Sequence, residues 1–196
     1  QYTYTFKDWT PEVETVTGDA TYQATYTKEA NTYTLTYDLD GGEWTEATNE
    51  FPYKYKATVE VVKTVPTREG YKFSGWRSEE VTIENDAFTM PAKDVTLKAK
   101  WNVNKYTIKW VDWDGSEVRT DTEVPYGTEL EAPADPTREA DAQYTYTFKG
   151  WTPEVETVTG DAVYTAVYDK EVNKYTIKWV NWDGSEVRTD TEVPYG

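Results

Sequence analysis

The segment that decides the fold runs from Tyr106 to Gly127 and reads YTIKWVDWDGSEVRTDTEVPYG. Up to Trp110 it alternates apolar and polar residues, and this period of two is typical of a half-buried β-strand. Asp114-Gly115 is a strong signal for a two-residue hairpin turn, because glycine accepts the positive φ that a tight turn needs. Glu117 to Val124 then returns as a second strand. The segment therefore predicts a β-hairpin.

This hairpin belongs to a repeat, which is the strongest signal in the chain. Tyr175–Gly196 reads the same as Tyr106–Gly127 with one substitution, and Tyr2–Asp19 matches Tyr144–Asp161 with one substitution. A more divergent copy begins at Tyr33. We divide the chain into the C-terminal half of a repeat (1–28), a divergent complete repeat (29–101), a typical complete repeat (102–169) and the N-terminal half of another repeat (170–196).

The typical repeat continues past its first hairpin into a loop and two more strands. Thr128–Asp141 is rich in acidic residues and proline and predicts a loop, whereas Tyr144–Trp151 and Val163–Tyr168 alternate as strands. The divergent repeat has a longer middle, with a short helix expected around Thr45–Glu50. Polar linkers between repeats are short and without Gly/Ser runs, which favours a semi-stiff array. The predicted core consists of Ile108, Trp110, Leu130, Phe148, Trp151, Ala166 and Tyr168, with Leu35, Tyr37, Phe73, Trp76, Ala99 and Trp101 in the divergent copy.

Composition excludes several classes of protein. The chain has no Cys, no His and a formal net charge of -16. Without these residues there is no Ser-His-Asp triad, thiolate nucleophile, disulfide framework or imidazole zinc site. The negative charge opposes binding to nucleic acid and to anionic membranes. Because aromatic residues make up 16% of the chain, we expect folded β structure rather than disorder.

The order of motifs in these repeats resembles the Listeria–Bacteroides repeat family, also called the internalin B-type B repeat. Three stretches of the divergent copy carry the resemblance: Tyr33–Gly42, Pro66–Trp76 and Met90–Trp101. The copy at 106–168 departs from the family's pattern, because Ala140–Gln143 is inserted and the Met-Pro-Ala segment is missing. The resemblance implies small β-grasp-like modules of about four strands each, in an elongated array on a secreted or wall-anchored bacterial protein. It supplies no catalytic residues and no cofactor.

One candidate metal site lies at the turn of the typical repeat. Asp112, Asp114 and Glu117 follow the D-x-D-G-x-E pattern that begins a calcium loop. Calcium requires six to eight oxygen ligands, and this segment alone cannot supply them. The alternative is that Asp-Gly serves the backbone geometry of a hairpin turn, and we favour that interpretation.

Four aromatic residues are candidates for binding a ligand. Trp113, Trp182, Tyr126 and Tyr195 alternate away from the predicted core face, and exposed aromatic rings of this kind could stack on sugars. In small domains large aromatic residues are more often structural, so the alternative is that they cover the core or the joint between repeats.

The sequence thus predicts a non-catalytic tandem-repeat segment of a bacterial cell-surface protein, acting as a stalk, spacer or adhesin fibre. Its partners would be neighbouring repeats of the same chain, with no nucleic acid and no insertion into a membrane. One alternative is a module that binds carbohydrate or a host protein through exposed aromatics. Another is a fibre protomer that assembles head to tail, because the two half-repeats nearly complement each other. We expect the sequence to be a piece of something larger.

Overall fold

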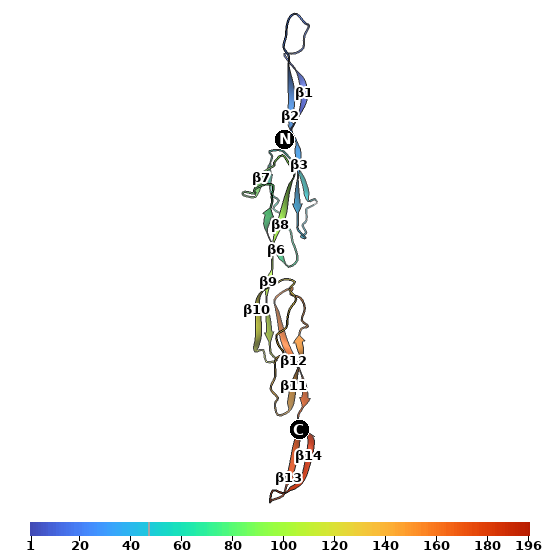
Figure 1. The fold of residues 1–196 in the computed structure, drawn as a ribbon, viewed down its shortest axis with the longest axis vertical. Coiled ribbons are helices and arrows are strands. Elements are labelled where there is room, and N and C mark those ends of the chain that lie inside the picture. Colours follow the sequence, from blue (N-terminus) through green and yellow to red (C-terminus); the bar gives the residue numbers. More distant parts are fainter. Residues whose placement is uncertain (47) are drawn as a thin grey trace. The chain divides into compact units, whose positions relative to one another are not determined.

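The computed structural model describes residues 1–46 and 48–196. In these residues the chain forms strands β1 to β14 and no helix, which confirms the prediction of a mainly β fold (Figure 1). The strands cluster into two compact units, Gln1–Asn102 and Val103–Gly196, and each unit has its own hydrophobic core. Over the same residues, no helix has the length and apolar character needed to cross a membrane.

The four-stranded sheet of the second unit has the order β10-β9-β12-β11 (Figure 1). Its strands are β9 (Lys105–Val111), β10 (Glu117–Pro125), β11 (Tyr144–Thr152) and β12 (Ala162–Val172). The central strands β9 and β12 are parallel, with Ala162 opposite Ile108 and Tyr164 opposite Trp110. The outer pairs are antiparallel. This order is that of a β-grasp sheet, and a loop occupies the β10–β11 connection where a β-grasp carries its helix.

The core of this unit forms where the central strands meet the loop that precedes β12. Ile108, Trp110 and Tyr164 are buried together with Val158, which lies in that loop. Two backbone hydrogen bonds hold Val158 in place: Gly127 N donates to its carbonyl at 2.7 Å, and its own N donates to Thr128 O at 3.0 Å. Of the predicted core residues, Ile108, Trp110 and Ala166 are buried, and Leu130, Trp151, Phe148 and Tyr168 are half-buried. Sequence reasoning missed Val158 and Tyr164.

The second unit also contains a separate hairpin of β13 (Lys174–Val180) and β14 (Glu186–Pro194), which form a two-stranded sheet. Its sequence repeats that of β9 and β10, but most of its apolar side chains are exposed.

The first unit has a similar arrangement. Strands β1 (Tyr2–Thr10) and β2 (Gln23–Ala30) form a hairpin by themselves. The main sheet, in the order β4-β3-β8-β6, consists of β3 (Thr32–Asp38), β4 (Glu50–Lys54), β6 (Tyr71–Arg77) and β8 (Val95–Val103). Its central strands β3 and β8 are parallel, as β9 and β12 are.

An additional small sheet fills the longer middle of this divergent copy. Strands β5 (Thr58–Glu60) and β7 (Ala87–Thr89) pair antiparallel and bring Val59 and Phe88 into the core. The predicted core residues Leu35, Tyr37 and Ala99 are buried, whereas Phe73, Trp76 and Trp101 are half-buried. The additional sheet explains why this core includes more aliphatic residues than the sequence suggested.

The prediction of a short helix around Thr45–Glu50 is wrong for the residues of that stretch that the structure describes. Ala47 lies outside the described residues. Its described residues form bends and irregular backbone that lead into β4. Asn49 is held on both sides, because its carbonyl accepts from Tyr37 N at 2.8 Å and its Oδ1 accepts from Trp44 Nε1 at 2.6 Å. These contacts with the sheet outweigh the weak local preference for a helix.

The hairpin turn is also longer than the two residues expected. Gly115 N donates to Asp112 O at 2.9 Å, and Asp112 N donates to Ser116 O at 2.8 Å. Trp113 and Asp114 therefore occupy the centre of a β-turn, and Gly115, with φ of 85°, closes it. This three-residue loop is a common hairpin connection, and its last position favours glycine because of the positive φ.

Candidate joint between repeats

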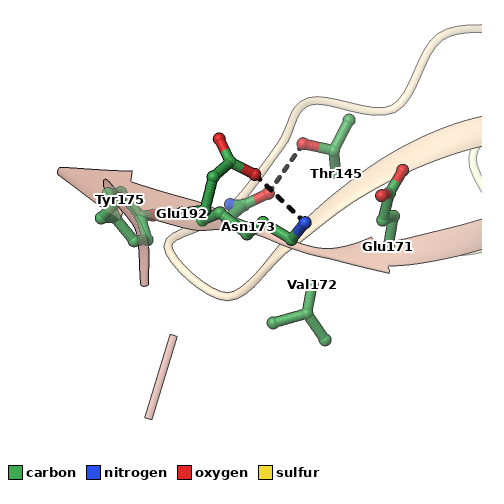
Figure 2. A pocket seen from close by; sticks show the side chains of 7 residues that line it. Thr145, Glu171, Val172, Asn173, Tyr175 and Glu192 are labelled. Atoms are coloured by element: carbon green, nitrogen blue, oxygen red, sulfur yellow. Dashed lines mark hydrogen bonds and ion pairs between the residues drawn. The ribbon is translucent and has the colours of Figure 1, made fainter. Parts of the chain in front are cut away.

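The most organised polar site in the second unit is centred on Asn173, the single residue between β12 and β13. Its Oδ1 accepts a hydrogen bond from Thr145 Oγ1 at 2.7 Å, as Figure 2 shows. Its Nδ2 donates to Asp141 O at 2.6 Å. Its backbone N donates to Gln143 O at 2.8 Å, and its carbonyl accepts from Tyr195 N at 2.9 Å. Asn173 thus bonds to the start of β11 and the segment before it on one side, and to Tyr195, directly after β14, on the other.

An ion pair lies beside this asparagine. Lys174 Nζ is 3.1 Å from Glu192 Oε2, and Glu192 sits at a bulge of β14 with φ of 59°. Lys105 and Glu123 repeat the arrangement in β9 and β10, also at 3.1 Å and with φ of 58° at Glu123. These pairs are exposed, so each contributes only about 0–1 kcal/mol to stability.

The first unit contains the same site around Asn31, the single residue between β2 and β3. Thr3 Oγ1 donates to Asn31 Oδ1 at 2.7 Å. The backbone N of Asn31 donates to Gln1 O at 3.0 Å, and its carbonyl accepts from Tyr55 N at 2.8 Å. Three of the four contacts of Asn173 therefore recur at Asn31, where β3 begins.

Sequence reasoning missed these asparagines, although a signal was present. Each expected linker contains an asparagine two residues before the tyrosine that opens the next hairpin: Asn31, Asn104 and Asn173. We interpreted these linkers only as short and polar. The residues that form hydrogen bonds with these asparagines lie far from them in the sequence, so the local pattern does not indicate the contacts.

Two of the four predicted ligand-binding residues lie at these joints. Tyr195 N donates to Asn173 O, and Tyr126 N donates to Asn104 O at 2.9 Å. The Tyr126 side chain is half-buried and that of Tyr195 is exposed. The structure thus places this pair beside the joints and apart from the other two candidates.

The two tryptophans lie on hairpin turns in different surroundings. Trp182 is 95% exposed. Trp113 is 50% exposed, and the Arg138 guanidinium carbon lies 3.7 Å from its ring centroid and 3.6 Å from that of Tyr146. Arg138 is thus stacked between two aromatic rings, a favourable cation–π arrangement that occupies one face of Trp113.

Two of the predicted calcium ligands, Asp112 and Asp114, form hydrogen bonds within the hairpin turn. Asp112 Oδ1 accepts from Trp113 N at 2.7 Å, and Asp114 Oδ1 accepts from Ser116 N and Ser116 Oγ at 2.9 and 2.6 Å. The Ser116 hydroxyl and N–H lower the pKa of Asp114 below its usual value. Among the described residues, no three His, Cys, Asp or Glu side chains form a group that could hold a metal, so Asp112, Asp114 and Glu117 are not brought together as ligands.

Asp112 also forms a hydrogen bond with a residue of β12. The Tyr168 hydroxyl donates to Asp112 Oδ1 at 2.9 Å. Burial, together with this hydrogen bond to a carboxylate, raises the pKa of Tyr168 from 10.0 to about 12. Both effects favour the neutral phenol in the folded state.

We expect this phenol to make stability depend on pH at high pH. A raised pKa in the folded state means that the contribution of Tyr168 is present below pH 10.0 and is lost as pH rises towards about 12. The melting temperature of the parent should therefore fall more steeply over this range than that of Tyr168→Phe. Tyr26→Phe, at the matching position of β2, is the control and should behave as the parent does. Equal slopes for Tyr168→Phe and the parent would contradict the assignment.

The fold and the joints together define a series of small β-sheets in which a single asparagine separates the last strand of one repeat from the first strand of the next. The sequence profile of the Listeria-Bacteroides repeat domain matches residues 33–100 and 106–177. The chain therefore belongs to this repeat family, as its motifs predicted.

The relatives fit this assignment. Internalin H of Listeria monocytogenes is 35% identical over 61% of this chain, and two proteins of Evansella cellulosilytica are 32% and 28% identical over 73% and 84%. The chain spans about one fifth of the length of these curated relatives, at 20%, 19% and 20%. Among solved structures, Streptococcal High Identity Repeats in Tandem (SHIRT) domains 3-4 from a cell surface protein match 72% of this chain and 99% of theirs, at 16% identity and a TM-score of 0.28.

Proposed function

We propose that this chain is a non-catalytic stalk or spacer segment of a bacterial cell-surface protein, or part of an adhesin fibre. Membership of a repeat family supports the proposal, as does the presence of Internalin H among the relatives. In this view the repeats have the boundaries expected from the sequence: 1–28, 29–101, 102–169 and 170–196. The net charge of -16, spread over them, would keep an extracellular array soluble.

The observation that carries the proposal is the recurring joint. At Asn31 and Asn173 only one residue separates the last strand of one repeat from the first strand of the next. The side chain and backbone of that residue are both hydrogen-bonded, to partners that come before and after it. A one-residue connection tied in this way has few free dihedral angles, so it should restrict bending far more than a flexible linker does.

The test makes one joint flexible by insertion and measures the distribution of distances between two labels on either side of it. The chain has no Cys, so spin labels can be placed at the exposed residues Lys149 and Glu186, on either side of Asn173. We expect a narrow distance distribution in the otherwise unchanged chain, and a clearly broader one after insertion of Gly-Gly behind Asn173. The same insertion between Asp114 and Gly115 is the matched control and should leave the distribution narrow. A distribution that is already broad before insertion would contradict a stiff joint.

A second candidate function is binding of carbohydrate or a host protein, and the exposure of Trp182 is the observation that favours it. A free indole face can stack on a sugar ring, whereas Trp113 already has Arg138 on one face. Retention on a glycan array that depends on Trp182 would support this role, and retention that survives Trp182→Ala would argue against it.

A further inference from the structure

A pocket of about 440 Å³ lies inside the complete repeat of the first unit. One wall is β6 from Phe73 to Trp76, and this strand is an outer strand of the main sheet. The other wall is the segment Val61–Val65, which follows β5. Lys100 of β8 and Asp86, in the turn before β7, also line the pocket. Its volume is in the range of sites for small ligands, about 300–1,000 Å³.

The wall that faces β6 is held in place by the rest of the repeat. Val61 N donates to Asp86 O at 2.8 Å, and Val62 N donates to the hydroxyl of the buried Tyr37 at 3.0 Å. Asn85 and Asp86 have φ of 48° and 57°, the two positive values of a type I′ hairpin turn, which Asn and Asp tolerate. The pocket is therefore formed before a ligand arrives, and binding requires little ordering of the chain.

Aromatic rings and cations lie together in this pocket. Phe73 and Trp76 are half-buried, with ring centroids 5.2 Å apart in an edge-to-face arrangement. Lys63 and Lys100 are exposed, and neither ammonium group forms an ion pair with any residue that the structure describes. Among the described lining residues, Asp86 is the only acid.

This local charge is opposite to that of the chain as a whole. The sequence has 36 acidic and 20 basic residues, yet the pocket has two lysines and one aspartate. The local potential is thus complementary to an anionic group, which the rest of the surface repels.

The lining specifies the chemistry of the ligand. Two free ammonium groups suit a carboxylate, because hydrogen bonds between charged partners are the strong ones. The Asp86 carboxylate accepts hydrogen bonds and therefore suits hydroxyl donors. The rings of Phe73 and Trp76 suit an apolar face of C–H groups. A sugar ring that carries a carboxylate offers all three features.

We propose that this pocket binds an acidic sugar, of the uronic acid type, in an extracellular glycan. The proposal goes beyond the stalk function. It takes up the carbohydrate binding named as the second candidate function, but at a site in the first unit rather than at Trp182.

The alternative occupant is an extended peptide that adds a strand to the free edge of β6. Two features of β6 oppose it. Gly75 has φ of 110°, so the backbone leaves the extended conformation in the middle of the strand, and Lys72 places a charge on the edge. Glycine kinks and lysines are devices that prevent pairing at sheet edges. The sugar is therefore the better fit.

The second complete repeat keeps the aromatic pair without the charges. Phe148 and Trp151 match Phe73 and Trp76, whereas Val167 stands where the first unit has Lys100. The sheet β5–β7 and the segment that follows β5 have no counterpart in the described residues of the second unit. The proposed site thus belongs to the divergent copy.

The first experiment compares two probes that differ in one group. The full chain is titrated with methyl glucuronide and with methyl glucoside, which has the same ring without the carboxylate, and NMR signals of Phe73 and Trp76 are followed. We expect saturable shifts with the glucuronide and binding roughly tenfold weaker with the glucoside, because the bonds to both ammonium groups are lost.

The second experiment removes the cations. Lys63→Gln and Lys100→Gln should each weaken glucuronide binding roughly fivefold and leave glucoside binding unchanged, so that the double variant no longer distinguishes the two probes. Lys72→Gln is the matched control, because this lysine is exposed on β6 but does not line the pocket. It should bind both probes as the parent does. Equal melting temperatures for all variants would show that the fold is kept.

Four results would overturn the proposal. The first is the absence of saturable shifts with the glucuronide, and the second is a preference for glucuronide that persists in the double lysine variant. The third is tighter binding of the acidic peptide EVEVE, acetylated and amidated, which would indicate strand addition. The fourth is loss of glucuronide binding in Trp182→Ala, which would place the sugar at that hairpin turn. The label distances across Asn173 report on the stalk function separately, so either proposal can fail without the other.

Discussion

Replacing Trp110 by Ala should destabilise the second unit by about 3–5 kcal/mol, the range for truncating a large aromatic residue in a core. Trp110 is fully buried, stacks on Tyr164 at 4.7 Å and contacts Trp151 edge-to-face at 5.0 Å. Its Nε1 also donates to Asp121 Oδ2 at 3.1 Å. A domain of this size has only about 5–15 kcal/mol of stability, so the loss is a large share of the total. Chemical denaturation followed by fluorescence of the second unit measures it.

Trp179→Ala supplies a matched control for this prediction. Trp179 occupies the same sequence position in the other copy and keeps the same kind of bond, from its Nε1 to Asp190 Oδ2 at 2.9 Å. It is more than half exposed, so we expect a loss below about 1 kcal/mol. Similar losses for the two variants would show that Trp110 is not the centre of the core.

Tyr37→Ala should have the corresponding effect in the first unit, about 3–5 kcal/mol, because the ring is packed among three aromatic residues. Its centroid lies 5.0 Å from that of Trp44, 5.7 Å from that of Phe51 and 4.8 Å from that of Trp76. The hydroxyl accepts a hydrogen bond from Val62 N at 3.0 Å. Tyr37→Phe keeps the ring and leaves that N–H without its partner, at a cost of about 1–3 kcal/mol.

Comparing the two substitutions separates the contribution of the ring from that of the hydroxyl. Denaturation monitored by Trp44 and Trp76 reports on the first unit. Tyr26→Ala, in the exposed hairpin β1–β2, is the control and should cost less than about 1 kcal/mol. If Tyr37→Phe proved as damaging as Tyr37→Ala, the hydrogen bond rather than the aromatic cluster would dominate this core.

Local sequence patterns predicted most of the strands. The alternation that begins at Tyr106 and Tyr144 gave β9 and β11 within one residue of their observed starts, because strand periodicity is set by neighbouring residues. The additional sheet β5–β7 was not predicted. Its strands are three residues each, too short to show a period of two, and they form because a distant segment pairs with them.

The candidate site was predicted less well for the same reason. Trp113, Trp182 and the Asp112 turn could be named as candidates because tryptophan and Asp-Gly are conspicuous in a sequence. The asparagine joints are formed by contacts between residues far apart in the sequence, such as that of Thr145 with Asn173, so no local pattern indicates them. The loop residue Val158 was missed likewise, since nothing around it alternates.

The sequence by itself determined the repeat, the strands with their apolar faces, and the absence of Cys and His chemistry. Only the tertiary structure decided which apolar faces are covered. Ile108 and Ile177 lie in the same local sequence, yet one is buried and the other is exposed. The difference arises because burial requires a second strand, and that strand comes from a part of the chain that the local pattern does not contain.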